Sequence, residues 1–153
     1  MKVFLLLAVF GGLVLLLSAC GGARQTGQLG LMGGLLQACP DSPNCVSSAS
    51  TDAAQQIEPF VLQVPSEDAW AAVKKTVPAL SRTLIISLTD DYLHAECRSA
   101  VLGFIDDLEL HLQSEQQLIA VRSAARLGYY DLGVNRKRVE ELRRQLRAAG
   151  VVR

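Results

Sequence analysis

The chain has 153 residues, half of them hydrophobic, and its 15 basic residues balance 15 acidic ones. This length provides for one domain and a linker. Only 5% of the residues are aromatic, and aromatic and basic side chains are not interleaved, which argues against nucleic-acid binding. The charge is unevenly distributed: residues 39–133 contain six basic and thirteen acidic residues, whereas residues 134–153 contain seven basic and two acidic ones. We expect a basic C-terminal helix that faces the acidic body, anionic lipid or another protein.

Residues 1–19 have the pattern of a secretory signal peptide. A charged start precedes an apolar run over 3–17, which is shorter than the roughly 20 residues that span a bilayer. The next residues, Leu17-Ser18-Ala19-Cys20, resemble the lipobox of bacterial lipoprotein precursors, in which an aliphatic residue and two small residues precede a cysteine. The resemblance implies cleavage before Cys20, with lipid on its thiol and an acyl chain on its new amino group. An uncleaved anchor helix is the alternative.

Such an anchor predicts where the protein is located. Each buried CH₂ of an acyl chain contributes about 0.8 kcal/mol, so several chains give durable attachment where one does not. Gly21, not Asp, follows Cys20, so the inner-membrane retention signal of enterobacterial lipoproteins is missing. We expect a cell-envelope protein, at the periplasmic face of the outer membrane in a Gram-negative source. Its expected partners are the membrane, through the anchor, and an unidentified envelope protein or lipid.

Residues 20–38 are predicted to form a lipidated, flexible tether, because Gly, Gln and Leu dominate and charge is nearly lacking. The packed part of the chain, 39–153, is predicted to be a single domain. Its first strand is expected near 57–64. A helix then begins with Ser66 as its cap, buries Trp70, Val73 and Val77 at helical spacing, and ends at Pro78.

Four further strands are expected, followed by a closing helix. Strands 83–89 and 92–98 flank a two-residue turn at Asp90-Asp91, which would place Leu88 opposite Leu93, Ile86 opposite Ala95 and Leu84 opposite Cys97. Strands 104–112 and 118–126 also alternate, and a helix capped by Asn135 runs to about residue 149. The order β-α-β-β-β-β-α predicts an α+β domain: a meandering antiparallel sheet of about five strands with two helices on one face.

Several stretches of this domain resemble the motifs of one protein family. They are Cys39-Pro-Asp-Ser-Pro-Asn-Cys-Val-Ser-Ser48, Tyr92-Leu-His-Ala-Glu96, Gly103-Phe-Ile-Asp-Asp-Leu-Glu109, Arg122-Ser123 with Arg126, Gly128-Tyr-Tyr-Asp-Leu-Gly-Val-Asn-Arg136 and Arg138-Val-Glu140. The family is domain-of-unknown-function family 1499 (DUF1499), and the resemblance runs from Cys39 to the C-terminus. Cys97 departs from its pattern. The resemblance implies kinship and no activity.

The cysteines predict a structural bridge. In an oxidising compartment, Cys39 and Cys45 are close enough along a proline-stiffened turn to form a disulfide, although free thiols or other pairings are alternatives. No histidine or further cysteine lies at a zinc-binding distance along the sequence. We therefore expect no metal site and no cofactor. Cys97 would be a small buried hydrophobic residue.

One face of the predicted sheet collects polar side chains: His94, Glu96, Asp107, Glu109, Arg122 and Arg126. Two interpretations compete for this possible functional face. It could form a carboxylate–histidine metal site or a general acid–base pair for hydrolysis. Alternatively it is a solvated face with cross-strand ion pairs, such as Glu109 opposite Arg122, and we favour this second interpretation.

Two further positions are candidates. Asp106 should point to the apolar side and accept backbone or arginine hydrogen bonds. Asp131 and Arg136 lie in the predicted loop before the last helix and form a possible binding loop.

The favoured function is therefore a non-catalytic binding or structural module on a membrane tether, with catalytic residues unknown. A hydrolase or metal-dependent enzyme that uses the polar face is the first alternative, and a carrier of lipid or another apolar ligand is the second.

Overall fold

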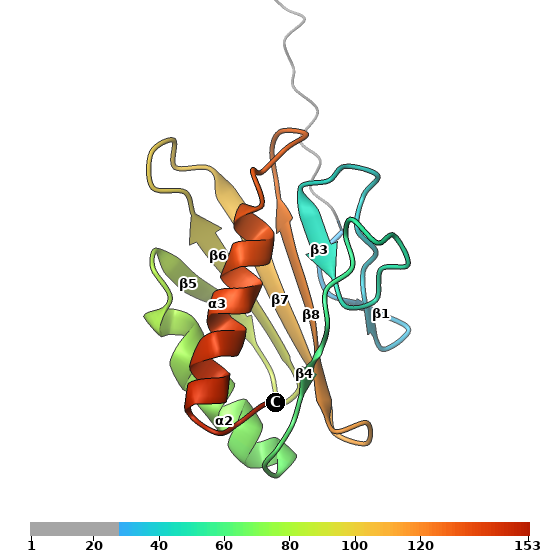
Figure 1. Ribbon diagram of the computed structural model, residues 1–153, viewed down its shortest axis with the longest axis vertical. Helices are drawn as coiled ribbons and strands as arrows, with labels where there is room; N and C mark the ends of the chain where they lie inside the picture. Colours follow the sequence, from blue (N-terminus) through green and yellow to red (C-terminus); the bar gives the residue numbers. More distant parts are fainter. Residues whose placement is uncertain (1–27) are drawn as a thin grey trace, which may run out of the picture.

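The computed structural model describes residues 28–153 (Figure 1). The predicted signal peptide and the predicted lipidation of Cys20 lie outside this range. Within it, no helix has both the length and the apolar character needed to cross a membrane.

The domain is α+β, as predicted, and is built on a six-stranded antiparallel sheet. The strand order is β3-β8-β7-β6-β5, and β4 also pairs with β8. The strands are β3 (Cys45–Ser47), β4 (Phe60–Val61), β5 (Thr83–Leu88), β6 (Tyr92–Arg98), β7 (Ile105–Gln113) and β8 (Leu118–Ala125). The last four form the predicted meander.

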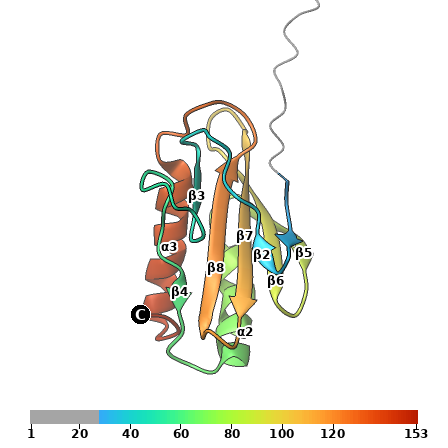
Figure 2. The ribbon, with the colours of Figure 1, turned by 90° about the vertical axis from the view of Figure 1, so that its right-hand side faces the viewer.

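Two helices cover one face of the sheet, as predicted (Figures 1 and 2). Helix α2 (Ser66–Thr76) passes into a 3-10 turn (Val77–Ala79) that contains Pro78, and α3 (Val134–Ala148) closes the fold. The predicted helix caps are wrong by one or two positions. Pro65, not Ser66, is the N-cap of α2, and Gly133, not Asn135, is the N-cap of α3. The core between the layers includes Trp70, Val73, Val77, Leu93, Leu108, Leu110, Val121, Val139, Leu142 and Leu146.

The β5–β6 hairpin departs from the predicted register. Leu88 pairs with Leu93 as expected, but a β-bulge at Ile86 makes Ile85, not Ile86, the partner of Ala95. An inserted residue reverses which side chains face the core. Ile85 therefore packs on the core, while Leu84 and Ile86 are exposed on this edge strand.

A short hairpin covers the second face of the sheet. Strands β1 (Leu31–Met32) and β2 (Leu35–Leu36) pair across Gly33 and Gly34, whose φ angles are 61° and 79°. Two consecutive positive φ angles are what a tight hairpin turn of this twist requires, and glycine adopts them without strain. Strand β2 contacts β7 and β8 on the side away from α3 (Figure 2). The prediction of a flexible tether up to residue 38 is therefore wrong from residue 31 onward.

Candidate functional site

The candidate polar residues share one face because β6, β7 and β8 are in strict antiparallel register. His94 pairs with Glu109, and Glu109 in turn with Arg122. Glu96 pairs with Asp107 on the same face. The four-residue β7–β8 turn thus gives the cross-strand pairing of Glu109 with Arg122 that the sequence indicates.

At the centre of this face, Glu109 and Arg122 form a buried ion pair. Arg122 Nη1 donates to Glu109 Oε2 at 2.6 Å, and the two side chains are 1% and 0% exposed. Glu109 Oε1 accepts two more hydrogen bonds, from the Gly30 backbone N–H and from the Tyr92 hydroxyl, each at 2.7 Å. Burial, reinforced by the neighbouring Glu109 carboxylate, raises the pKa of Tyr92. Both oxygens of the carboxylate are therefore occupied, and residues before β1 help to cover it.

A second cluster centres on Asp107. His94 Nε2 lies 2.7 Å from Asp107 Oδ1, and Arg126 donates to both carboxylate oxygens at 2.9 and 2.7 Å. The same guanidinium contacts Glu96 at 2.7 Å. Burial opposes ionisation of Asp107, but the hydrogen bonds from His94 and Arg126 prevail and lower its pKa. His94, Glu96, Asp107 and Arg126 thus form one network in which each charged group contacts another member.

The prediction that this polar face is exposed to solvent is wrong. The cross-strand ion pair predicted on it, Glu109 with Arg122, is present. His94, Asp107, Glu109 and Arg122 are all buried. The reason is the β1–β2 hairpin and the segment that follows it, which lie over the face. Alternation along a strand shows which residues share a face, whereas it carries no information about a distant segment that covers that face.

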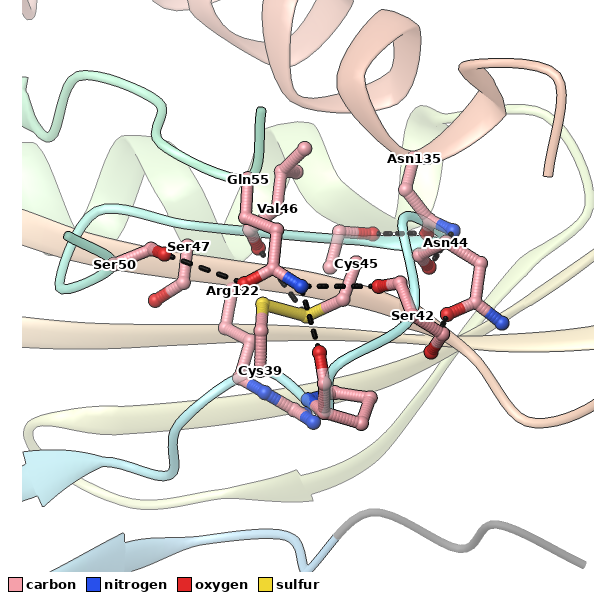
Figure 3. Close-up of a disulfide and its surroundings, with 12 residues drawn as sticks. Cys39, Ser42, Asn44, Cys45, Val46, Ser47, Ser50, Gln55, Arg122 and Asn135 are labelled. Atoms are coloured by element: carbon pink, nitrogen blue, oxygen red, sulfur yellow. Dashed lines mark hydrogen bonds between the residues drawn. A yellow bond between two sulfur atoms is a disulfide. The ribbon is translucent and has the colours of Figure 1, made fainter. Parts of the chain in front are cut away.

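A disulfide joins Cys39 to Cys45, as predicted, with 5.7 Å between the two Cα atoms. The enclosed loop is held by Gln55, whose Nε2 donates to the carbonyl oxygens of Pro40 at 2.6 Å and Ser42 at 3.0 Å (Figure 3). The bridge therefore connects the segment that follows the covering hairpin to β3 at the edge of the sheet. Cys97 is a free, buried thiol, and burial raises its pKa.

Of the two candidate loop residues, Asp131 has a structural role. Its Oδ1 accepts from the Gly133 N–H, and its Oδ2 accepts from the backbone and side-chain N–H groups of Asn135, all at 2.9 Å. Asp131, rather than the predicted Asn135, thus satisfies the free N–H groups at the start of α3. Arg136 points elsewhere and donates to the Ala54 carbonyl at 2.9 Å. The structure does not bring these two side chains together.

Asn135 has a different role from the one predicted. It is fully buried, its Oδ1 accepts from Ser123 Oγ at 2.7 Å and Arg138 Nη1 at 2.6 Å, and its Nδ2 donates to the Asn44 carbonyl at 3.1 Å. It therefore ties α3 to β8 and to the disulfide loop.

Asp106 meets an arginine, as predicted. Arg138 Nη2 of α3 donates to Asp106 Oδ2 at 2.7 Å. Burial raises the pKa of Asp106, and the Arg138 hydrogen bond opposes that shift. Arg143 of α3 donates to the Pro59 carbonyl at 3.0 Å. Two of the basic side chains of α3 therefore bind groups within the domain.

The open end of the domain is apolar. The β6–β7 loop (99–104) and the loop between β8 and α3 (127–133) lie together at one end of the sheet (Figure 1). With the start of α3 they line an open pocket of about 290 Å³. Large apolar side chains exposed there are Val101, Leu102, Phe104, Leu127, Tyr129, Tyr130, Leu132 and Val134. The sequence alone does not predict this site, because its two loops are far apart along the chain and only the fold brings them together.

A family model described as "Protein of unknown function (DUF1499)" matches residues 35–146. The chain belongs to the DUF1499 family. None of the curated proteins and none of the solved structures matches it.

The DUF1499 match extends over the polar face and the second strand of the hairpin that lies over it, whereas Gly30 and β1 lie before the match. It begins at β2, includes the disulfide loop and both ion-pair clusters, and ends within α3. The stretches that resemble DUF1499 motifs map onto the disulfide loop and β3, the paired strands β6 and β7, and the Asp131 turn with Arg138. These residues make contacts between elements that are far apart in the sequence, so they are explained by the fold.

The geometry of the DUF1499 domain limits the chemistry available to these side chains. Among residues 28–153, no three or more His, Cys, Asp or Glu side chains gather where they could hold a metal ion. His94 is paired with Asp107, and His111 lies near Gln113 and Asp91. The buried carboxylates and the arginines stabilise one another.

Proposed function

We propose that this DUF1499 protein is a lipid-anchored component of the bacterial cell envelope that acts as a non-catalytic binding or structural module. The lipobox-like sequence at residues 17–20 supports the anchor. The buried Glu109–Arg122 pair is the observation that carries the non-catalytic role, because a carboxylate that is 0% exposed and accepts three hydrogen bonds has no position for a substrate.

An enzyme that uses the polar face is the less supported function. A general acid or base must come within hydrogen-bond reach of its substrate, directly or through one water. Here His94, Asp107 and Glu109 are buried and already bonded to protein partners, and Glu109 also accepts from Gly30 just before the N-terminal hairpin. Catalysis would require the hairpin to leave the sheet, at the cost of breaking the bond from Gly30 to Glu109.

A carrier of an apolar ligand is also less supported. Ligand sites usually bury most of the ligand surface in an enclosed cleft. The pocket of about 290 Å³ is open, and side chains on its wall such as Val101 and Leu132 are 90% and 88% exposed. Such a surface suits contact with another apolar surface better than enclosure of a molecule.

Intact-mass analysis of the protein extracted by detergent from its native membranes tests the proposal, with metal content measured on the same sample. We expect a mature chain that begins at residue 20 and carries two or three acyl chains, with no stoichiometric metal. A Cys20→Ala variant should lose both the lipid mass and the cleavage. An unlipidated native chain would contradict the anchor, and stoichiometric metal would support the enzyme instead.

A further inference from the structure

We propose that the apolar end formed by residues 99–104 and 127–134 docks onto the anionic phospholipid surface of the membrane that holds the N-terminal anchor. The inference rests on the proposed lipid anchor and adds to it a defined orientation of the domain. We call these two segments the apolar end.

The composition of the apolar end is the first argument. Its exposed side chains are aliphatic or aromatic and come from two neighbouring loops and the first residue of α3. Val101 and Leu132 at its tips are almost fully exposed, so they contribute little to the packed core. A contiguous exposed apolar surface of this kind marks an interaction site. Tyr129 and Tyr130, whose rings pack edge to face 4.8 Å apart, combine an apolar body with a polar tip, as side chains at a membrane interface do.

The charges around the apolar end are the second argument. A neighbouring hollow that shares Ser99, Ala100 and Val134 with it is lined by the basic residues Arg82, Arg98, Lys137 and Arg138. Arg82, Arg98 and Lys137 are exposed. Basic residues beside an apolar surface complement a bilayer that carries negative headgroups.

The nearby acidic groups do not cancel this charge. Asp106 is paired with Arg138, and Glu141, which also lines the hollow, is paired with Arg144. Asp131 accepts hydrogen bonds with both oxygens from the start of α3. The exposed basic residues Arg82 and Lys137, which have no carboxylate partner among the described residues, therefore outnumber Asp131, the one carboxylate of these three that is not paired with an arginine.

The length of the tether permits this orientation. Gly30 is fixed to Glu109, the fifth residue of the nine in β7, which is about 14 Å from the strand end that adjoins the apolar end. The ten residues from Cys20 to Gly30 can span up to about 35 Å. The anchored cysteine can therefore reach the plane of the apolar end. Because the tether is long enough to allow other orientations as well, the apolar end would decide which orientation the domain adopts.

Docking can be measured with a tryptophan placed on the apolar end. The lipidated, full mature protein carrying Val101→Trp would be reconstituted into phosphatidylglycerol vesicles that contain phospholipids brominated on their acyl chains. We expect the emission of the added tryptophan to shift to shorter wavelength and to be largely quenched. The unsubstituted protein, in which Trp70 is buried, provides the baseline.

Three comparisons complete the test. Glu115→Trp places the probe in the β7–β8 turn at the opposite end of the sheet, where it should be neither shifted nor quenched. Adding Leu132→Asp to Val101→Trp should abolish most of the quenching, since Leu132 is exposed and its replacement spares the fold. Quenching should also fall sharply on phosphatidylcholine vesicles, which lack net charge.

Equal quenching at positions 101 and 115, or none at either, would overturn docking. A shift at position 101 without bromine quenching would show that protein, such as a second copy, covers the apolar end, and would also overturn it. Flotation of every variant with the vesicles reports the lipid anchor separately, so a failure of docking is distinguishable from a failure of the anchor.

Discussion

The backbone N–H of Gly30 donates to Glu109 Oε1 at 2.7 Å, across 79 residues of sequence. This single contact joins the beginning of the described chain to the middle of β7, on the face of the sheet opposite the helices (Figure 2). It shows that the N-terminal hairpin is part of the domain. The sheet consequently has an apolar core under the helices on one side and, where β2 contacts β7 and β8 on the other side, a buried network of charges.

The Tyr92 hydroxyl provides the first prediction, since it shares Glu109 Oε1 with Gly30. Tyr92→Phe should lower the free energy of unfolding at neutral pH by about 1.5–3 kcal/mol, the range for a hydrogen bond to a charged group. Because the pKa of Tyr92 is raised in the folded state, the unfolded chain loses this proton first, and stability should fall as the pH rises above about 10. Tyr92→Phe should reduce that fall. Urea unfolding at pH 7 and pH 10.5 measures both effects, and the exposed Tyr130→Phe is the matched control. Equal behaviour of the two variants would contradict the contact.

The disulfide provides the second prediction. Its cysteines are six positions apart, and a loop of this size corresponds to about 2–3 kcal/mol of stabilisation in the chain-entropy description. A Cys39→Ser/Cys45→Ser double variant should lose about this amount in urea unfolding. The unsubstituted protein in reductant should match the double variant, which itself should not respond to reductant. An unchanged unfolding midpoint in both cases would contradict a structural role for the bridge.

Adjacent aspartates provide the third prediction, because their pKa shifts have opposite signs. The pKa of Asp107 is lowered by folding, so its stabilisation is complete above the unfolded pKa of about 3.9 and is lost as the pH falls through the folded value. The pKa of Asp106 is raised, so its contribution improves as the pH falls toward the unfolded value. Asp107→Asn should therefore flatten the acid loss of stability, and Asp106→Asn should steepen the decline below neutral pH. Unfolding midpoints between pH 3 and pH 7 distinguish the two, and identical slopes would contradict the assignment.

The turn before α3 provides the fourth prediction. Asp131→Ala removes three hydrogen-bond acceptor contacts at the start of the helix, and the loss of a helix cap costs about 1–2 kcal/mol. Arg136→Ala removes one exposed contact and should change stability by no more than about 0.5 kcal/mol. Thermal unfolding of the two variants gives the comparison. A larger loss for the Arg136 variant would contradict the structural role of Asp131.

Much of the fold follows from sequence patterns, for reasons that are local. Alternation in β7 and β8 fixes which residues face the helices, and the four-residue turn fixes the register that pairs Glu109 with Arg122. The bulge at Ile86 could not be predicted, because the sequence Leu84-Ile85-Ile86 is apolar at every position and so does not show which of these side chains faces the core. The Gly33-Gly34 turn is a hairpin signal, but its flanking strands have only two residues each, too few for alternation to distinguish them from a flexible tether.

The burial of the polar face could not be derived from its own residues. Whether His94, Asp107 and Glu109 meet water depends on where residues 28–45 lie, which is a tertiary relationship. The apolar end was missed for a similar reason, since Val101 and Leu132 are 31 positions apart along the chain and only the fold places their loops together.

Paired substitutions test most directly our claim that the Glu109–Arg122 pair stabilises the fold and takes no part in a reaction. Glu109→Gln and Arg122→Met each leave one buried partner uncompensated, and each should lower the free energy of unfolding by about 3–5 kcal/mol. The double replacement Glu109→Gln/Arg122→Met should recover a large part of that loss, because it removes the desolvation cost of both charges while the glutamine carbonyl can still accept from Gly30 and Tyr92. Urea unfolding that leaves both single variants as stable as the unsubstituted protein would contradict the claim, since a pair retained for chemistry alone would be dispensable for stability.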